Sequence, residues 1–389
     1  MANRIVIWGD DHHNALGLLR MLSRRTFDVD FVIDGPVKNI ATASKYCNHY
    51  VVVSGTDAAI NYLLKTYQDK NNKAVLLFTA DKYSEAANKN LSLLNDFFYV
   101  SGPSKEGLLA EIDDKYVMGQ LASECGITIP ETILFPDNPI DNVTNFPLVV
   151  KPCNPTAKDF KIRIVNNTKQ LQKLSKQLMP QKRYVVQSFI NKKADGLIYG
   201  CRTWDGVTHL AGICVRNRWS DDGCGSFGYI TSEIPNSVCI TGIEQFLQGI
   251  DFRGIFSVEY ALTDDKAFFY EFNLRNDGTA VLFYNAGSNI ALTFVNSCFG
   301  IKEEVSTKVN GKQYLMHEIL DRFNIYDGVV SKKQWQEDSK KVSLYFLYDP
   351  DDMKPYEIQK SLTTKLFIHH VIARSWINKL RLMIKKAIK

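Results

Sequence analysis

Short apolar runs alternate with amphipathic stretches over the first hundred residues. Residues 4–9, RIVIWG, predict a buried strand that ends in the polar loop GDDHHN, and the helical pattern ALGLLRMLSRR follows it. The alternation continues to the apolar run KAVLLFTA at residues 73–80. A strand–helix–strand order is typical of a parallel sheet with covering helices. We therefore expect an α/β, doubly wound N-terminal domain.

The polar loop after the first predicted strand has two interpretations. Ligands of such sheets lie outside the carboxyl ends of the strands, which places Gly9 to Asn14 at a ligand site. Alternatively, Asp10, Asp11 and Asn14 only cap the first helix. The sequence leaves both interpretations open.

From residue 107 the pattern changes to longer elements with antiparallel signals. Residues 107–126 predict one amphipathic helix, and the apolar runs at 146–152 and 183–190 predict strands. Two hairpins are expected, with turns at 205–206 and 264–266. Beyond Gly300, a helix over 314–328, a strand over 340–350 and a helix over 368–389 are expected.

Composition and charge exclude several classes of protein. The net charge of +5, much of it in the last sixteen residues, does not favour nucleic acid as a partner. The 8 cysteines are scattered without a C-x-x-C pair, which favours reduced thiols in a cytoplasmic protein and argues against a zinc site. Neither a signal peptide nor a membrane-spanning run is predicted.

The C-terminal stretch is basic and amphipathic. It carries six cations from Arg374 to Lys389 without an acidic residue, while Trp376, Leu380 and Met383 recur at helical spacing. Such a helix can lie on the inner face of a membrane or dock on its own protein. We favour docking.

The most informative stretch is the hairpin at residues 256–279. Glu259 lies in its first strand, and Glu271, Asn273 and Arg275 follow in the second with a spacing of two, so we expect these three on one face. Hard oxygen ligands beside a guanidinium suit Mg²⁺ bound to a polyphosphate. The alternative is a hairpin with one solvated, charged face.

Two lysines and an apolar strand add to this pattern. Lys151 ends the apolar strand PLVVKP, where a buried ammonium needs a partner such as a phosphate oxygen. Lys115 on its own is typical of a surface lysine. The end of the strand at 185–190 can pair its backbone groups with an adenine edge.

With these residues in this order, the chain resembles the ATP-grasp superfamily, and within it the D-aspartate ligase-like carboxylate–amine ligases. The resemblance covers roughly residues 4–300 and rests on Asp114-Lys115, FPLVVKP, VVQSFI and GIFSVEY…FFYEFNLRNDG. It implies a pre-ATP-grasp domain at 1–105, an ATP-grasp domain at 106–300 with subdomains at about 106–183 and 184–300, and a C-terminal extension at 301–389.

The resemblance also implies a role for each matching residue. ATP and one or two Mg²⁺ ions, with Mn²⁺ as an alternative, would be the cofactors. The implied roles are phosphate contacts for Lys115 and Lys151, adenine contacts for Gln187, Ser188, Phe189 and Ile190, a ribose contact for Asp195, metal ligation for Glu259, Glu271 and Asn273, and stabilisation of the transferred phosphoryl group for Arg275.

Two features depart from the superfamily pattern. The hinge often reads Gln-Glu in the superfamily, but here it reads Gln187-Ser188. The loop after Lys151, CNPTAKDFK, lacks the usual glycines, so that either Lys158 and Lys161 supply charge or the loop is mobile without ATP.

A second arginine-containing stretch lies near residue 220. Gly223–Gly228 reads G-x-G-x-x-G but does not open a helix in the first βαβ unit, so we interpret it as a loop near the substrate. Arg216 and Arg218 precede it and either bind the carboxylate or acyl-phosphate or end a solvated strand. We place Arg218 with Arg275 among the catalytic candidates.

The expected activity is ATP-dependent amide formation between a small-molecule carboxylate and an amine, through an acyl-phosphate. An amino acid or a cell-envelope precursor is the expected substrate. Two alternatives remain: an inactive nucleotide-binding regulator or scaffold, and an ATP-grasp carboxylase or phosphotransferase. The sequence names neither the substrates nor the oligomeric state.

Overall fold

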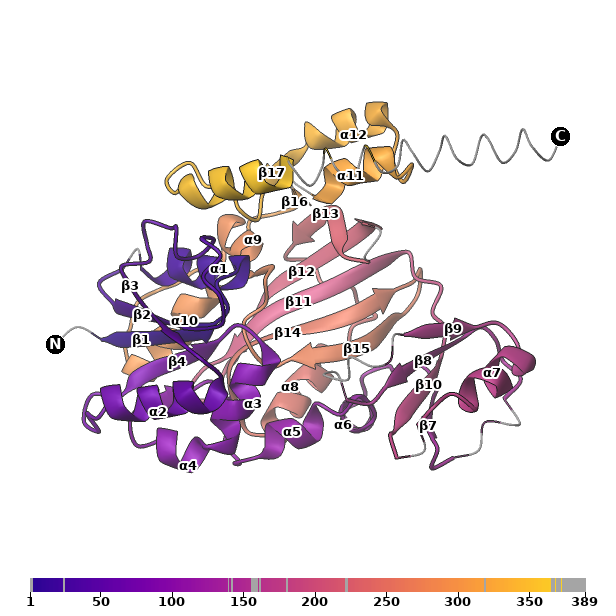
Figure 1. Cartoon of the computed structure of the whole chain (residues 1–389), viewed down its shortest axis with the longest axis horizontal. Helices are drawn as coiled ribbons and strands as arrows, with labels where there is room; N and C mark the ends of the chain where they lie inside the picture. The colour runs from indigo at the N-terminus through magenta and orange to yellow at the C-terminus, as the bar shows by residue number, and fades with distance from the viewer. Residues whose placement is uncertain are drawn as a thin grey trace.

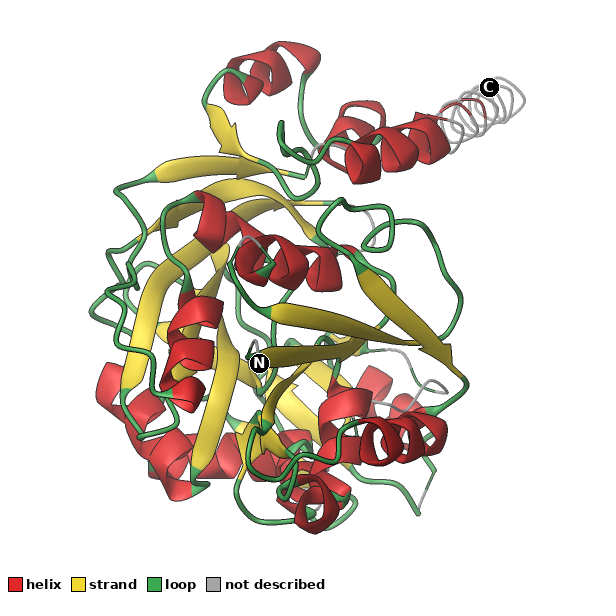
Figure 2. Cartoon of the chain, turned by 90° about the vertical axis from the view of Figure 1, so that its left-hand side faces the viewer, coloured by secondary structure: helices red, strands yellow, loops and turns green. Residues whose placement is uncertain are grey.

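Three β-sheets and their covering helices make up the part of the chain that the structure describes. This computed structural model describes residues 3–364 except 24, 139, 141–142, 155–159, 161, 180, 221–222 and 318–319, and in addition residues 368 and 372. Figures 1 and 2 show a large central sheet with the N-terminal domain on one side, a small sheet on the other and the C-terminal segment above.

Two expectations concern the C-terminal stretch and membrane-spanning helices. The basic stretch from Arg374 to Lys389 lies outside the described residues, so its docking stays a prediction. None of the described helices is long and apolar enough to cross a membrane.

The N-terminal domain is a five-stranded parallel sheet with strand order β3-β2-β1-β4-β5. The order turns back at β1, as in doubly wound sheets, and confirms the predicted fold class. Strand β1 lies in the middle because its residues Ile5 to Trp8 are fully buried on both faces. The elements are β1 (Arg4–Gly9), α1 (His13–Leu22), β2 (Asp28–Asp34), β3 (His49–Val53), α2 (Thr56–Thr66), β4 (Ala74–Phe78), α3 (Asp81–Lys89), α4 (Leu91–Leu94) and β5 (Phe98–Val100).

The polar loop after β1 does not cap the first helix. The buried carboxylate of Asp11 accepts hydrogen bonds from the backbone N–H groups of residues 38–42 and from the Thr42 hydroxyl. The N-cap of α1 is His12, which makes no side-chain capping bond. The capping interpretation is therefore wrong, and Asp11 instead orders the loop that follows β2.

The small sheet is antiparallel, with strand order β7-β10-β8-β9 and helix α7 packed on it. Its connection from the N-terminal domain differs from the expected single helix over 107–126. Asp114 accepts hydrogen bonds from the N–H groups of Tyr116 and Val117, so a second helix begins at Lys115. The elements are α5 (Leu108–Ile112), α6 (Lys115–Glu124), β7 (Thr132–Phe135), β8 (Leu148–Pro152), β9 (Arg163–Val165), α7 (Thr168–Ser175) and β10 (Tyr184–Ser188).

The central sheet contains both predicted hairpins. Strands β11 and β12 form the first and β14 and β15 the second, in the order β15-β14-β11-β12-β13-β16-β17, with β6 paired to β14. Its elements are β6 (Gly102–Pro103), β11 (Ala194–Arg202), β12 (Thr208–Trp219), β13 (Gly225–Thr231), α8 (Ile240–Gly249), β14 (Phe252–Leu262), β15 (Ala267–Asn273), α9 (Ala280–Asn285) and α10 (Ile290–Phe299).

The C-terminal segment extends the central sheet. Strand β16 (Gln313–Met316) pairs with β13, and β17 (Val342–Leu344) pairs with β16. Helices α11 (Leu320–Tyr326) and α12 (Lys332–Ser339) follow β16, and residues 354–364 are helical. The stretch expected as a helix over 314–328 thus begins as strand β16 and is helical over Leu320–Tyr326, and the strand expected over 340–350 is reduced to three residues.

One hydrophobic core joins the N-terminal domain to the central sheet. Helix α1 packs on α9 so closely that a Cβ on Gly17 would lie 3.2 Å from the Cβ of Val281. The same core includes Leu197 from β11 and Leu344 from β17. Burial of this shared apolar surface fixes the N-terminal domain against the sheet that carries the candidate site.

Candidate active site

The hairpin of β14 and β15 brings two carboxylates together. Glu259 lies directly opposite Glu271 in the antiparallel register. Beside this pair a β-bulge leaves Tyr270 without a partner on β14, and such a bulge re-aims the neighbouring side chains. Two like charges opposite each other on adjacent strands are unfavourable unless a cation lies between or beside them.

Both predicted lysines lie beside this pair. The Nζ atom of Lys115 is 2.6 Å from Oε2 of Glu271. The N–H of Lys115 also donates to the Cys153 carbonyl at 2.9 Å, so the start of α6 is attached to the end of β8, the strand that carries Lys151. Lys115 and Glu271, which are 156 positions apart in the sequence, thereby belong to one cluster of charges with Lys151.

Burial and the neighbouring charges shift the pKa values of the groups in this cluster. Burial raises the pKa of Glu259 to about 7, with Arg216 opposing and Glu271 adding to the rise. Burial acts on Glu271 in the same direction, but the cations Lys115, Lys151 and Arg275 together outweigh it and lower the pKa of that carboxyl. Burial, together with Lys115, lowers the pKa of Lys151 to about 8. The charged form of Lys151 is therefore destabilised by its surroundings in the folded protein.

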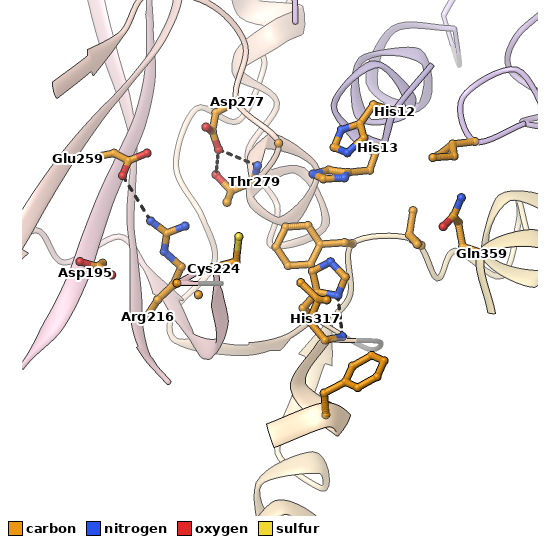
Figure 3. Close-up of a pocket in the computed structure, with 18 of the residues that line it drawn as sticks. His12, His13, Asp195, Arg216, Cys224, Glu259, Asp277, Thr279, His317 and Gln359 are labelled. Atoms are coloured by element: carbon orange, nitrogen blue, oxygen red, sulfur yellow. Dashed lines mark hydrogen bonds and ion pairs between the residues drawn. The ribbon is translucent and has the colours of Figure 1, made fainter. Parts of the chain in front are cut away.

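Two cavities meet at the carboxylate pair. The first, of about 530 Å³, contains both lysines, Glu259 and Glu271 and is lined by residues 187–192 after β10. The second, of about 930 Å³, lies between the central sheet, the start of α1 and the C-terminal segment (Figure 3). Glu259, Tyr270 and Lys192 line both cavities, so a group transferred between them would pass these side chains.

Comparison with known proteins identifies this arrangement of sheets and cavities. The fold is similar to that of ADP-bound N5-carboxyaminoimidazole synthetase from Staphylococcus aureus, with a TM-score of 0.63, 13% identity and coverage of 87% of each chain. The chain has the ATP-grasp fold. No protein-family model matches the sequence, and no curated protein matches it.

Two further solved structures share this fold. L-amino acid ligase from Bacillus licheniformis has a TM-score of 0.57 and 15% identity, with coverage of 76% of this chain and 74% of that one. Biotin carboxylase from Campylobacter jejuni has a TM-score of 0.61 and 14% identity, with coverage of 82% and 76%. At these identities the likeness establishes the ATP-grasp fold only. The activity has to be inferred from the residues of the site.

The expected adenine hinge lines the smaller cavity. Gln187, Ser188, Phe189 and Ile190 all contribute to its wall. Several of their groups are already bonded: the Gln187 amide donates to the Thr132 hydroxyl, and the Phe189 N–H donates to the Pro147 carbonyl. The loop after Lys151, with Lys158 and Lys161, lies largely outside the described residues.

Asp195 lines the larger cavity and not the one that holds the hinge, and its ribose role stays a prediction. Its carboxylate accepts a hydrogen bond from Lys192 at 2.5 Å and another from the Trp219 indole. The Lys192 ammonium also lies 5.0 Å from the Trp219 ring centroid. This trio forms part of the wall between the cavities.

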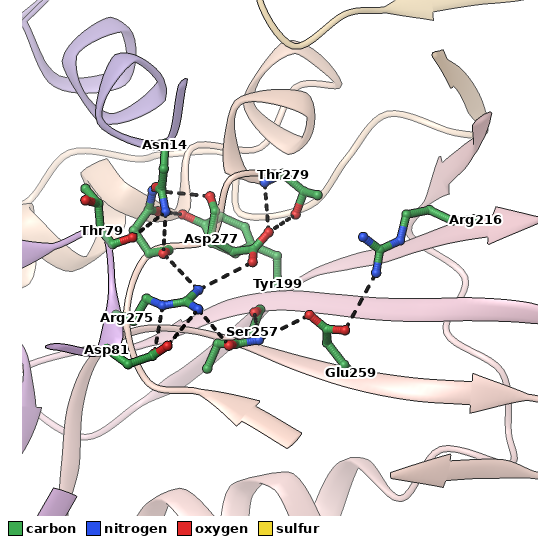
Figure 4. Close-up of polar contacts among 12 residues, drawn as sticks. Asn14, Thr79, Asp81, Tyr199, Arg216, Ser257, Glu259, Arg275, Asp277 and Thr279 are labelled. Atoms are coloured by element: carbon green, nitrogen blue, oxygen red, sulfur yellow. Dashed lines mark hydrogen bonds and ion pairs between the residues drawn. The ribbon is translucent and has the colours of Figure 1, made fainter. Parts of the chain in front are cut away.

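Arg275 connects the site to the N-terminal domain. It follows the end of β15, and its guanidinium donates to Asp81 at 2.9 Å and to Oδ1 of Asn273 at 2.9 Å (Figure 4). Asp277 lies 3.5 Å away. Among the three residues expected on one strand face, only Glu271 and Asn273 are within β15.

Arg218 has partners other than the expected substrate. Its guanidinium pairs with Asp321 and with Asp338, each at 2.9 Å, and both carboxylates belong to the C-terminal segment. Arg216 instead faces the site, with Nη2 3.7 Å from Oε2 of Glu259 (Figure 4). The geometry corrects the sequence interpretation: Arg216, and not Arg218, is the arginine of the candidate site.

The oxygen atoms of this cluster offer an incomplete set of ligands for a divalent ion. Glu259 and Glu271 offer carboxylate oxygens, whereas the Asn273 amide donates from Nδ2 to Glu259 at 3.3 Å and its Oδ1 accepts from Arg275. Among the described residues no group of three or more acidic, His or Cys side chains could hold a metal alone. Mg²⁺ commonly binds one or two carboxylates together with substrate phosphates, so the set fits an ion that arrives with a nucleotide.

Sequence reasoning identified the larger cavity only in part. His12, His13 and His317 line it with Asp277 and Thr279. These residues come from the start of α1, the end of β16 and the turn after β15, which no local spacing connects. The interpretation of Gly9 to Asn14 as a ligand site agrees with the positions of His12 and His13, whereas no signal in the sequence indicated His317.

Proposed function

We propose that the protein is an ATP-dependent carboxylate–amine ligase that forms an amide through an acyl-phosphate. One observation carries this proposal: Lys115, Lys151, Glu259 and Glu271 meet where two cavities join, and one of these cavities is lined by the hinge. This arrangement supports a site for phosphate groups beside a site for a second substrate.

ATP would occupy the smaller cavity. The Ile190 N–H and the Phe189 carbonyl would contact the adenine edge, since the Phe189 N–H is already bonded to Pro147. Lys115 and Lys151 would neutralise phosphate oxygens as point charges. Glu259 and Glu271 would hold Mg²⁺, which supplies charge neutralisation at the phosphates when it is bound.

The carboxylate substrate would lie in the larger cavity near Arg216. One of its oxygens bonds to the γ-phosphorus while the bond from that phosphorus to the β–γ bridging oxygen breaks and ADP leaves. An amine then attacks the acyl carbon, the C–O bond to phosphate breaks, and the amine loses a proton. Positioning and charge neutralisation by the named cations supply the catalysis.

Replacing Glu271 by Gln tests the proposal. We expect Mg²⁺-dependent ADP release with a mixed pool of carboxylates and amines to fall at least 100-fold, while the thermal transition stays within a few degrees. Glu124→Gln, on the exposed end of α6, is the matched control. Unchanged ADP release by Glu271→Gln would exclude the proposed metal site.

The same assay separates the alternatives. Nucleotide binding without ADP release from any pool would favour a regulator. ADP release that needs bicarbonate and no amine would favour a carboxylase. The amide product, identified by mass spectrometry, is the result expected here.

A further inference from the structure

The larger cavity has two chemically different ends. At the carboxylate pair it is charged, with Arg216, Glu259 and Asp277. At the other end the C-terminal segment contributes Phe323, Phe346 and Leu347, and it also adds Gln359 and Thr363 to the lining. A ligand that fills the cavity would therefore meet charged groups at one end and a largely apolar wall at the other.

Arg216 at the charged end is built to receive an anion. Its Nη2 lies 3.7 Å from Glu259, beyond hydrogen-bond distance, and its buried Nε has no hydrogen-bond partner among the described residues. Its stem packs on Gly225, where a Cβ would lie 2.4 Å from Cδ of the arginine. A substrate carboxylate would supply the oxygen partners that this guanidinium lacks.

Aromatic rings make up much of the other end. The Phe346 ring lies 5.8 Å from the His13 ring and 5.0 Å from the His317 ring. Burial holds the pKa of His13 well below its usual value, so this imidazole is neutral at pH 7. His13 fits there because Gly278 has no side chain: a Cβ on it would lie 2.5 Å from Nε2.

We propose that the carboxylate substrate carries an aromatic or branched apolar side chain. Its carboxylate lies at Arg216, and its side chain lies among Phe323, Phe346 and Leu347. The C-terminal segment, which supplies these three residues, then selects the substrate. This inference rests on the proposed ligase function.

Matched carboxylates test the side-chain class. ADP release is measured with L-phenylalanine, L-leucine, L-alanine or L-glutamate as the carboxylate and a fixed pool of amines. We expect kcat/KM for phenylalanine or leucine to exceed that for alanine or glutamate at least 10-fold, because a buried apolar group discriminates by roughly 10–200-fold. A spread below about 3-fold, or a preference for glutamate, would overturn the proposal.

Phe323→Ala tests the place of binding. The variant should lose at least 10-fold in kcat/KM for phenylalanine and less than 3-fold for alanine. Tyr326→Ala removes an exposed aromatic ring from the same helix and should leave both values unchanged. An equal loss for both substrates would mean a structural role for Phe323 and would refute the assignment.

Failure of the ligase function can be recognised separately. If none of the carboxylates raises ADP release, direct binding of L-phenylalanine and L-glutamate to the whole protein is measured by calorimetry. Tighter binding of phenylalanine that Phe323→Ala weakens would support the apolar end without the ligase chemistry. Equal or absent binding would overturn the inference itself.

Discussion

Replacing Lys151 by Met should stabilise the ligand-free protein and weaken its binding of ATP. Lys151 is partly buried on β8 and has no ion-pair partner among the described residues, since Glu271 pairs with Lys115. Methionine keeps most of the length of the side chain and removes the charge. If Lys151 had only a structural role, its replacement by Met would lower both the stability and the affinity for ATP.

The pKa of Lys151 sets the size of the effect. A fall from 10.5 to about 8 corresponds to about 3 kcal/mol that the folded protein spends to keep this ammonium charged at pH 7. We therefore expect Lys151→Met to raise the free energy of unfolding by about 1–3 kcal/mol. Loss of a charge-assisted contact to phosphate costs roughly 1.5–3 kcal/mol, or about 10- to 150-fold in the Kd for ATP.

The pH dependence gives a second, independent measure. The folded protein loses the Lys151 proton near pH 8, whereas the unfolded chain keeps it to about 10.5. Between these values the unfolded chain binds more protons, so the stability of the unchanged protein rises with pH. The advantage of Lys151→Met should shrink to about half by pH 9.5.

Urea denaturation at pH 7 and 9.5 and calorimetry with ATP measure these quantities. Lys173→Met removes an exposed lysine of α7 and should change neither stability nor ATP binding. A Lys151→Met protein that is less stable at pH 7, or that binds ATP within 2-fold of the unchanged protein, would refute the placement of Lys151 at the phosphates.

Three further substitutions test other parts of the structure. Arg218→Met should lower the free energy of unfolding by roughly 3–5 kcal/mol in urea, because it leaves the fully buried Asp321 without its cation; lost turnover at unchanged stability would instead restore Arg218 as a catalytic candidate. A bulky maleimide on the exposed Cys224, which lines the larger cavity, should reduce ADP release at least 10-fold, whereas Cys224→Ser should stay active and resist the reagent. Asp114→Ala should lower the free energy of unfolding, measured by thermal unfolding, by about 1 kcal/mol, because it removes the N-cap of α6. It should also raise the KM for ATP, because this cap positions Lys115. An unchanged KM would contradict that role of Asp114.

Local patterns were enough for the doubly wound sheet, the two hairpins and the charged cluster. Strand β1 is apolar at every buried position, and the turn at 264–266 separates two alternating runs, so short windows contain the signal. Glu271 and Asn273 could be placed on β15 by their spacing alone. Lys151 was found because an ammonium at the end of an apolar strand is costly.

The choice between Arg216 and Arg218 shows what the sequence could not decide. Regular alternation would place both side chains on one face of β12. The register shifts between them, however, because Arg216 pairs with Gly228 while Arg218 pairs with Phe227, which leaves Asn217 as an extra residue. The bulge sends the two arginines to different environments, and such a bulge depends on the partner strand.

Long-range contacts explain the remaining errors. The helix expected over 107–126 is interrupted because Asp114 caps a new helix whose first N–H, on Lys115, donates to the Cys153 carbonyl. The C-terminal segment became part of the central sheet because β13 offered a free edge to β16. In both cases the contacting segment is distant in the sequence, so local propensity could not predict the contact.

The two arginines of β12 also show how structural charges differ from charges that await a ligand. Arg218 contacts Asp321 and Asp338 at 2.9 Å and thereby attaches the C-terminal segment to the sheet. Arg216, two residues earlier, has Glu259 at 3.7 Å as its one ion-pair partner in the part of the chain that the structure describes. A fold that satisfies one buried guanidinium so fully has no geometric obstacle to satisfying the other. The incomplete pairing of Arg216, like that of Lys151, is therefore best explained by anionic partners that arrive with the substrates.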